Sequence, residues 1–141
     1  MITAGPTREK IDPVRFITNY SSGKMGYAIA SQAVKMGAEV TLVSGPTLLS
    51  DPENVNTIRV ESAEEMYNAV TKLYNDVDIV IKTAAVADYR SANISPHKMK
   101  KQSENITLEL ERTKDILKEL GKTKSHQFLV GFAAESHNIE E

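Results

Sequence analysis

The sequence predicts an α/β fold, namely an open, doubly wound parallel sheet with one inserted antiparallel strand and a basic flap. Short apolar segments alternate along the chain with segments of helical periodicity, as in a parallel sheet with helices on both faces. The segment 78–81 is almost wholly apolar, which is typical of a central parallel strand. A polar stretch containing glycine separates the first strand from the first helix, where such sheets bind nucleotides or phosphates.

Five segments have the composition of parallel strands. They span residues 2–5, 39–44, 57–60, 78–81 and 128–133. The second of them ends at Gly45-Pro46, which is a strong turn signal. A further segment, 106–111, alternates apolar and polar residues, and we expect it to form a half-exposed antiparallel strand.

Three helices are predicted between these strands. Ser21 or Ser22 caps the first, which runs to about Met36 and stops at Gly37. Ser62 begins the second in a capping-box pattern. The third runs from a Thr113 cap through Leu120 to a stop at Gly121. The residues expected to face the core are Met25, Ile29 and Ala33 of the first helix and Met66, Ala69, Val70 and Leu73 of the second.

The start of the first helix is the strongest candidate for an anion site. The residues expected to bind a phosphate or substrate there are Ser21, Ser22, Gly23, Lys24 and Gly26. Glycines allow the backbone to approach a ligand, and free amides at a helix start favour an anion. The spacing of the two glycines is a weak signal alone and matches neither the G-x-G-x-x-G nor the P-loop pattern. The long connection over residues 6–20 strengthens it, since most such connections are shorter.

Two residues before this helix each allow a purely structural and a functional interpretation. Arg15 is either a surface arginine or a guanidinium that binds a phosphate or carboxylate. Asn19 is either a turn or cap residue or a donor to an acyl oxygen on which charge develops.

The end of the fourth strand and the segment after it form a second candidate region. Small residues after Lys82 leave room for a ligand at the edge of the sheet. Asp88 then either caps a helix or pairs with Arg90, or it binds nucleotide hydroxyls or amines, or a metal through water. The basic residues of a flap at about 91–105 form a solvated face or close over phosphates. Phe132, after the last strand, packs in the core or stacks on a base.

Composition limits the class of protein. The chain has 141 residues, which we interpret as one domain over 1–141, and a net charge of −2, which does not favour nucleic-acid binding. There is no cysteine and no signal-peptide pattern, so we expect a cytoplasmic protein. No apolar run approaches the roughly 18 residues of a membrane span, so no membrane partner is expected.

Several motifs together resemble the phosphopantothenoylcysteine synthetase (phosphopantothenate–cysteine ligase) family, often the carboxy-terminal half of a bifunctional coenzyme A biosynthesis flavoprotein. The motifs are Thr3-Ala-Gly-Pro-Thr-Arg-Glu9, Asp12-Pro-Val-Arg-Phe-Ile17, Thr18-Asn-Tyr-Ser-Ser-Gly-Lys-Met-Gly26, Ala84-Ala-Val-Ala-Asp-Tyr-Arg90, Lys98-Met-Lys-Lys101 and Gly131-Phe-Ala-Ala-Glu135. The resemblance spans the whole chain. Jointly the motifs are specific, although each alone is not.

The resemblance implies a Rossmann-like, homodimeric enzyme of coenzyme A biosynthesis, within a larger oligomer if it is fused to the decarboxylase. In that family, 4′-phosphopantothenate attacks CTP to give an acyl-cytidylate and pyrophosphate, with Mg²⁺ assisting. Cysteine then displaces CMP and an amide forms.

The resemblance also implies roles for individual residues. Asn19 and Arg15 correspond to residues that act on the acyl-cytidylate, and Lys98 to the flap lysine that aids its formation. Ala85 lies among the expected substrate-binding positions. The positions implied to bind CTP are Lys82, Thr83, Ala84, Asp88, Lys98, Lys114, Asp115, Ile116, Leu117 and Phe132, while the metal ligands are left unassigned.

Two features depart from the family pattern. Lys114 stands where a proline is usual, and the lysine-rich segment that follows in the family is absent, so we expect a domain incomplete at its C-terminus, and whether this fragment is itself active stays open. Two other functions are compatible with an α/β fold. A nicotinamide-dependent reductase would need a glycine fingerprint and a Tyr-x-x-x-Lys pair, which the sequence lacks. A non-catalytic nucleotide-binding module stays open.

Overall fold

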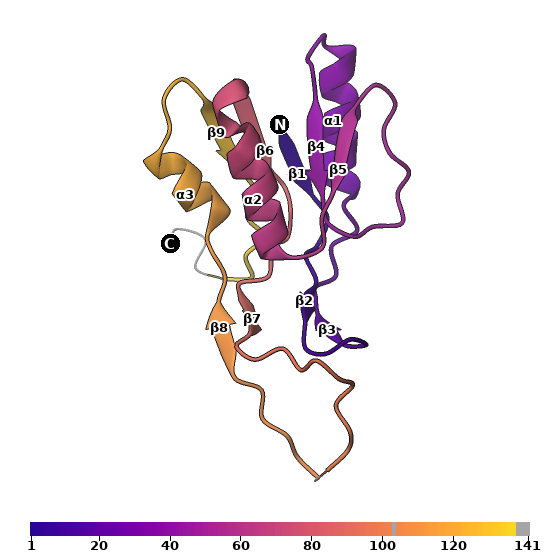
Figure 1. Cartoon of the computed structure of the whole chain (residues 1–141). Helices are drawn as coiled ribbons and strands as arrows, with labels where there is room; N and C mark the ends of the chain where they lie inside the picture. The colour runs from indigo at the N-terminus through magenta and orange to yellow at the C-terminus, as the bar shows by residue number, and fades with distance from the viewer. Residues whose placement is uncertain (103, 138–141) are drawn as a thin grey trace.

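A five-stranded parallel sheet forms the centre of the computed structural model, which describes residues 1–102 and 104–137. The strand order is β5-β4-β1-β6-β9, and all four pairings are parallel (Figure 1). The strands are β1 (Ile2–Ala4), β4 (Thr41–Ser44), β5 (Asn56–Arg59), β6 (Ile79–Lys82) and β9 (Phe128–Gly131). The predicted fold class is confirmed, and each predicted parallel strand is present with slightly different bounds.

Helices cover both faces of the sheet. The helix α1 (Lys24–Lys35) packs on one face, while α2 (Ala63–Leu73) and α3 (Ile116–Lys122) pack on the other, and each face has its own apolar core. A short 3₁₀ helix, η1 (Tyr74–Asp76), follows α2. The order of strands reverses between β1 and β6, which places the binding crevice of such sheets at their carboxyl ends. In the described residues, every helix is too short or too polar to cross a lipid bilayer.

The first helix lies unusually close to the sheet because of Gly26. A Cβ atom at Gly26 would lie 2.5 Å from Ala4 Cβ and 2.5 Å from Thr83 Oγ1. Met25 points away and is 47% exposed, so the prediction that it shares the buried face is wrong. The residues of α1 that are buried or pack against the core are Gly26, Tyr27, Ile29, Ala30, Ala33 and Val34.

The caps of the other two helices differ in how well the sequence predicted them. Ser62 Oγ accepts the backbone N–H of Glu65 at 3.1 Å, which confirms the predicted start of α2. The prediction that Thr113 caps α3 is wrong, because Asp115 accepts the capping hydrogen bond instead. The helix also continues past Gly121, which does not stop it.

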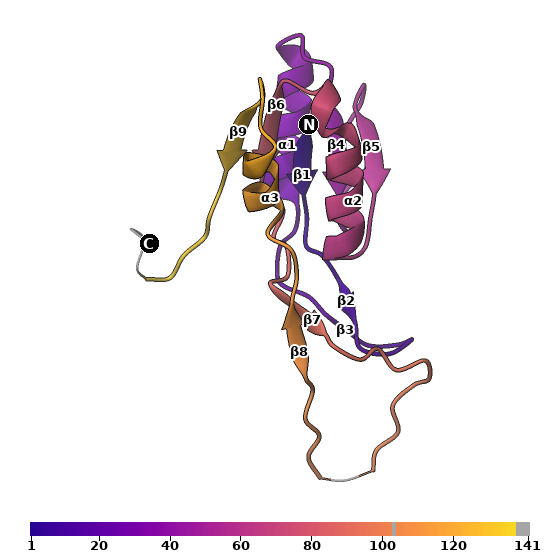
Figure 2. The same cartoon turned by 60° about the vertical axis from the view of Figure 1, so that its left-hand side comes forward.

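Two small hairpins project from the carboxyl edge of the sheet, and we call them together the arm (Figures 1 and 2). They pair β2 (Glu9–Lys10) with β3 (Phe16–Ile17), and β7 (Tyr89–Ser91) with β8 (Leu110–Arg112). The predicted antiparallel strand is present, but its predicted bounds, 106–111, are wrong, since only the last two of those residues are in β8. The flap links β7 to β8, and its residue 103 lies outside the described residues.

The amino end of α2 anchors both hairpins of the arm. Glu9 is 3% exposed. Both of its carboxylate oxygens accept the backbone N–H of Ala63, each at an N···O distance of 3.2 Å. Burial raises the pKa of Glu9. Arg90 pairs with Glu64 at 3.1 Å and with Glu111 at 2.9 Å. The alternative in which Asp88 pairs with Arg90 is thus not realised.

Candidate functional site

Asn19 joins the loop before α1 to the end of β6. Its Nδ2 donates to the carbonyl oxygen of Ala85 at 2.7 Å, and its Oδ1 accepts the backbone N–H of Ser21 at 3.1 Å. Three predicted site residues thus lie together at the carboxyl ends of β1 and β6. The Asn19 side chain is exposed.

The first turn of α1 begins at Gly23, which takes the N-cap position with φ 81°. The prediction that Ser21 or Ser22 caps the helix is wrong. A Cβ atom at Gly23 would lie 3.4 Å from Gly5 Cα, so both the left-handed conformation and the close approach favour glycine. Lys24 follows at the first helical position and is exposed, which leaves its charge at the positive end of the helix.

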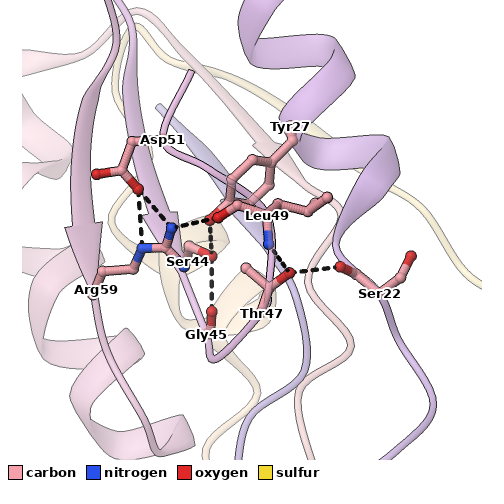
Figure 3. A network of polar contacts seen from close by, with 8 residues as sticks. All are labelled: Ser22, Tyr27, Ser44, Gly45, Thr47, Leu49, Asp51 and Arg59. Atoms are coloured by element: carbon pink, nitrogen blue, oxygen red, sulfur yellow. Dashed lines mark hydrogen bonds and ion pairs between the residues drawn. The ribbon is translucent and has the colours of Figure 1, made fainter. Parts of the chain in front are cut away.

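The loop between β4 and β5 holds the loop before α1 in place (Figure 3). Thr47 Oγ1 donates to the carbonyl oxygen of Ser22 at 2.8 Å and accepts the N–H of Leu49 at 3.3 Å. Arg59 in turn donates to the carbonyl oxygen of Leu49 at 2.9 Å and pairs with Asp51 at 2.5 Å. Sequence reasoning missed Thr47, because the contact joins two loops that carry no shared motif.

Arg15 lies in the β2–β3 hairpin and contacts the flap. Its Nη1 donates to Asp12 Oδ2 at 2.6 Å and to the carbonyl oxygen of Met99 at 3.2 Å. Met99 follows Lys98 in the chain, and Lys98 itself is exposed. Arg15 therefore meets the flap one residue from the predicted catalytic lysine.

A basic cavity of about 210 Å³ lies between the end of β6 and the start of α3. Five predicted CTP-binding residues line it: Lys82, Asp88, Lys114, Asp115 and Ile116. Four further residues line it that the sequence analysis did not assign to a site: Val86, Arg112, Thr113 and Lys118. Four basic and two acidic side chains make this cavity positive, although the chain as a whole is negative. The Nζ atom of Lys114 lies 4.4 Å from the ring centre of Tyr67, a cation–π contact.

The other five predicted CTP-binding residues do not line this cavity: Thr83, Ala84, Lys98, Leu117 and Phe132. Thr83 Oγ1 donates to the carbonyl oxygen of Thr3 at 2.7 Å, and Ala84 is buried in the core. Phe132 is 50% exposed at the end of β9, which excludes a core position, and its N–H donates to the carbonyl oxygen of Lys82 at 3.1 Å. The backbone of Phe132 therefore lies beside Lys82, which lines the basic cavity.

The described residues contain no group of three or more His, Cys, Asp or Glu side chains placed to hold a metal ion. Asp88 is an exposed carboxylate in the basic cavity. Mg²⁺ in nucleotide sites is commonly held by one or two carboxylates together with the phosphates. The described residues thus fit a magnesium ion carried by a nucleotide better than one held by the protein alone.

Comparisons with known proteins place the whole chain in one group. The model of the DNA/pantothenate metabolism flavoprotein C-terminal domain matches residues 1–141. The coenzyme A biosynthesis bifunctional protein CoaBC of Bacillus subtilis is 60% identical over 141 residues, which are 99% of this chain and 35% of that protein.

Solved structures agree. The crystal structure of the C-terminal domain of a coenzyme A biosynthesis bifunctional protein CoaBC is 62% identical with a TM-score of 0.86, covering 99% of this chain and 65% of that one. A Cab2 mutant in complex with phosphopantothenate-cysteine has a TM-score of 0.81 at 16% identity, covering 97% of this chain and 64% of that one, which shows the same fold. The chain thus spans about a third of the length of its relative from Bacillus subtilis.

Proposed function

The chain belongs to the DNA/pantothenate metabolism flavoprotein C-terminal domain family, and we propose that it is the phosphopantothenate–cysteine ligase part of a coenzyme A biosynthesis protein. In the proposed first step, the carboxylate of 4′-phosphopantothenate attacks the α-phosphorus of CTP, and pyrophosphate leaves. In the second, the amine of cysteine attacks the acyl carbon, CMP leaves, and the amide forms with loss of a proton.

The observation that carries this proposal is that one segment, residues 82–88, connects Asn19 with the basic cavity. Ala85 accepts the amide of Asn19, whereas Lys82 and Asp88, on either side of it in the sequence, line the basic cavity. A carboxylate held near Asn19 would then lie beside a nucleotide in a positively charged cavity. Preorganised donors and cations of this kind stabilise the charge that develops in acyl and phosphoryl transfer.

The proposed role of Mg²⁺ is to neutralise the nucleotide phosphates when it is bound. Asp88 is the residue of the basic cavity that would hold it, directly or through water. The cations of this chain act on the same charge. Lys82 and Lys114 line the cavity, and Lys24 stands at the start of α1.

We also propose that the arm is the homodimer surface, within a larger oligomer if a decarboxylase is fused to it. Its large apolar side chains are exposed, which marks a surface for association. They are Val14, Phe16, Tyr89, Ile94, Ile106, Leu108 and Leu110. Sedimentation equilibrium tests this, and a monomer at micromolar concentration would contradict it. The cytoplasmic location stays a prediction.

Pyrophosphate release from CTP and 4′-phosphopantothenate, with Mg²⁺ and with or without cysteine, tests the proposed function. We expect release with CTP in the absence of cysteine, and much less release with ATP. Binding of CTP without release would identify a nucleotide-binding module instead. If CTP does not bind and no pyrophosphate is released, the proposal is refuted for this chain.

Replacing Lys98 with glutamine is expected to slow this release about 10–100-fold, because a hydrogen bond to a charged group contributes about 1.5–3 kcal/mol. The matched control is Lys35→Gln, in the last turn of α1 and so at the opposite end of that helix from the crevice. The control should release pyrophosphate at the wild-type rate. Equal rates for both variants would remove Lys98 from the mechanism.

A further inference from the structure

Asp12 is a buried carboxylate whose two oxygens have different tasks. The residue is 1% exposed and lies in the turn between β2 and β3. Its Oδ1 accepts the backbone N–H groups of Val14 at 2.8 Å and Arg15 at 2.7 Å. These two contacts close the turn locally, as an aspartate at the start of a turn commonly does.

The second oxygen makes contacts that the turn does not need. Asp12 Oδ2 accepts Arg15 Nη1 at 2.6 Å and the backbone N–H of Met99 at 3.0 Å, 87 residues away. The Met99 hydrogen bond is the largest of the contacts that hold the pKa of Asp12 well below its usual range, against the effect of burial. Asp12 is therefore charged at neutral pH, and its charge is balanced by Arg15 and by the flap backbone.

The same hairpin holds the flap at a second point. The N–H of Ser95 donates to the carbonyl oxygen of Ile11 at 3.0 Å. Lys98 lies between this contact and the Met99 contact. A lysine in a segment fixed at both ends has fewer conformations to lose when it binds a phosphate, which lowers the entropic cost of binding.

We propose that Asp12 is a positioning residue that holds Arg15 and the flap backbone beside Lys98 in one arrangement. This inference rests on the proposed function, because that function assigns the roles of Arg15 and Lys98. Asp12 itself is buried and acts through its neighbours. A buried carboxylate destabilises the folded protein unless it is paired. Removing the contacts that Asp12 Oδ2 makes with Arg15 and Met99 should therefore loosen the flap.

Asp12→Asn tests this inference selectively. The amide keeps one oxygen to accept the turn N–H groups, but its NH₂ group cannot accept from Arg15 or Met99. We expect kcat for pyrophosphate release to fall at least about tenfold, the size of effect typical when a positioned group is lost. Asp78→Asn is the matched control, because Asp78 is exposed and immediately precedes β6, at the amino ends of the strands and so away from the crevice. An Asp12→Asn enzyme with the wild-type kcat would overturn the inference.

Two further variants separate positioning from a general structural role. Met99→Pro removes the flap N–H and leaves the carboxylate in place, so it should also lower kcat even if Asp12→Asn folds poorly. Asp12→Asn should cost a smaller factor in the Lys98→Gln background than in the wild type, because residues that act as a unit are not additive. Equal factors in both backgrounds would show that Asp12 does not act through Lys98.

Amide hydrogen exchange at Met99 tests the contact without any substrate. We expect the Met99 amide to exchange faster in Asp12→Asn than in the wild type and in Asp78→Asn. If the wild type releases no pyrophosphate, the proposed function fails, while faster exchange still supports Asp12 as the flap anchor. Unchanged exchange would overturn that anchor whether or not the enzyme turns over.

Discussion

Asn19→Ala is expected to slow amide formation about 10²–10³-fold while the acyl-cytidylate still forms, which is the usual cost of removing one donor to a developing oxyanion. An amide nitrogen carries two N–H groups, so one can hold Ala85 while the other donates to a substrate oxygen. Rapid-quench measurement of pyrophosphate and of amide product separates the two steps. Pyrophosphate should appear without product, and the cytidylate should accumulate.

Asn19→Asp is the informative partner of this variant. It keeps the oxygen that accepts the Ser21 N–H but loses the donor. Both variants should lose amide formation if donation is what matters. If Asn19→Asp forms amide at the wild-type rate, Asn19 serves only to hold the loop. Asn68→Ala, exposed on α2, controls for loss of an amide and should behave as wild type in both steps.

The sheet and its helices were predictable because their signals are local and periodic. The apolar strand at 78–81 and the capped start of α2 at Ser62 both carry their evidence within a few residues. The third helix shows the limit of such evidence. Thr113 and Asp115 are both competent caps two residues apart, but Thr113 Oγ1 donates to the carbonyl oxygen of Ala87, while Asp115 accepts the capping hydrogen bond.

The arm was largely missed because its strands are too short to show a period. β2 and β3 have two residues each, and what holds them is Glu9 at the amino end of α2. The same reason hides the Asp12–Met99 contact, which joins two loops far apart in the chain. The Asp12-Pro13 pair is a local turn signal, but no local pattern places the flap beside that turn.

The candidate site was likewise predictable only in part. The identities of Asn19 and Lys98 came from the family resemblance, and no local pattern would have distinguished them from loop residues. The structure adds which of the named residues share a cavity. Arg112 and Lys118 joined that group only because β8 and α3 meet beside β6.

Gly45→Ala is expected to cost about 3 kcal/mol or more of the free energy of unfolding, at the upper end of overpacking effects. A Cβ atom there would lie 1.7 Å from the carbonyl oxygen of Pro6 and 2.8 Å from its carbonyl carbon. Both atoms are backbone, so the strand ends must separate to admit it. The shift would also displace Ala85, which pairs with Pro6 in an isolated bridge, and so disturb the crevice.

Gly121→Ala provides the opposite expectation. It lies within α3, and a Cβ there would meet none of the described atoms within 4 Å, so the substitution should stabilise by about 0.5–1 kcal/mol. Thermal unfolding compares the two: we expect Gly45→Ala to melt roughly 10 °C below the wild type and Gly121→Ala slightly above it. A Gly45→Ala protein with the wild-type melting temperature would mean that Pro6 does not pack against Gly45 as closely as the structure has it. The placement of Ala85 beside Asn19 would then need to be reconsidered as well, because the same strand ends set both contacts.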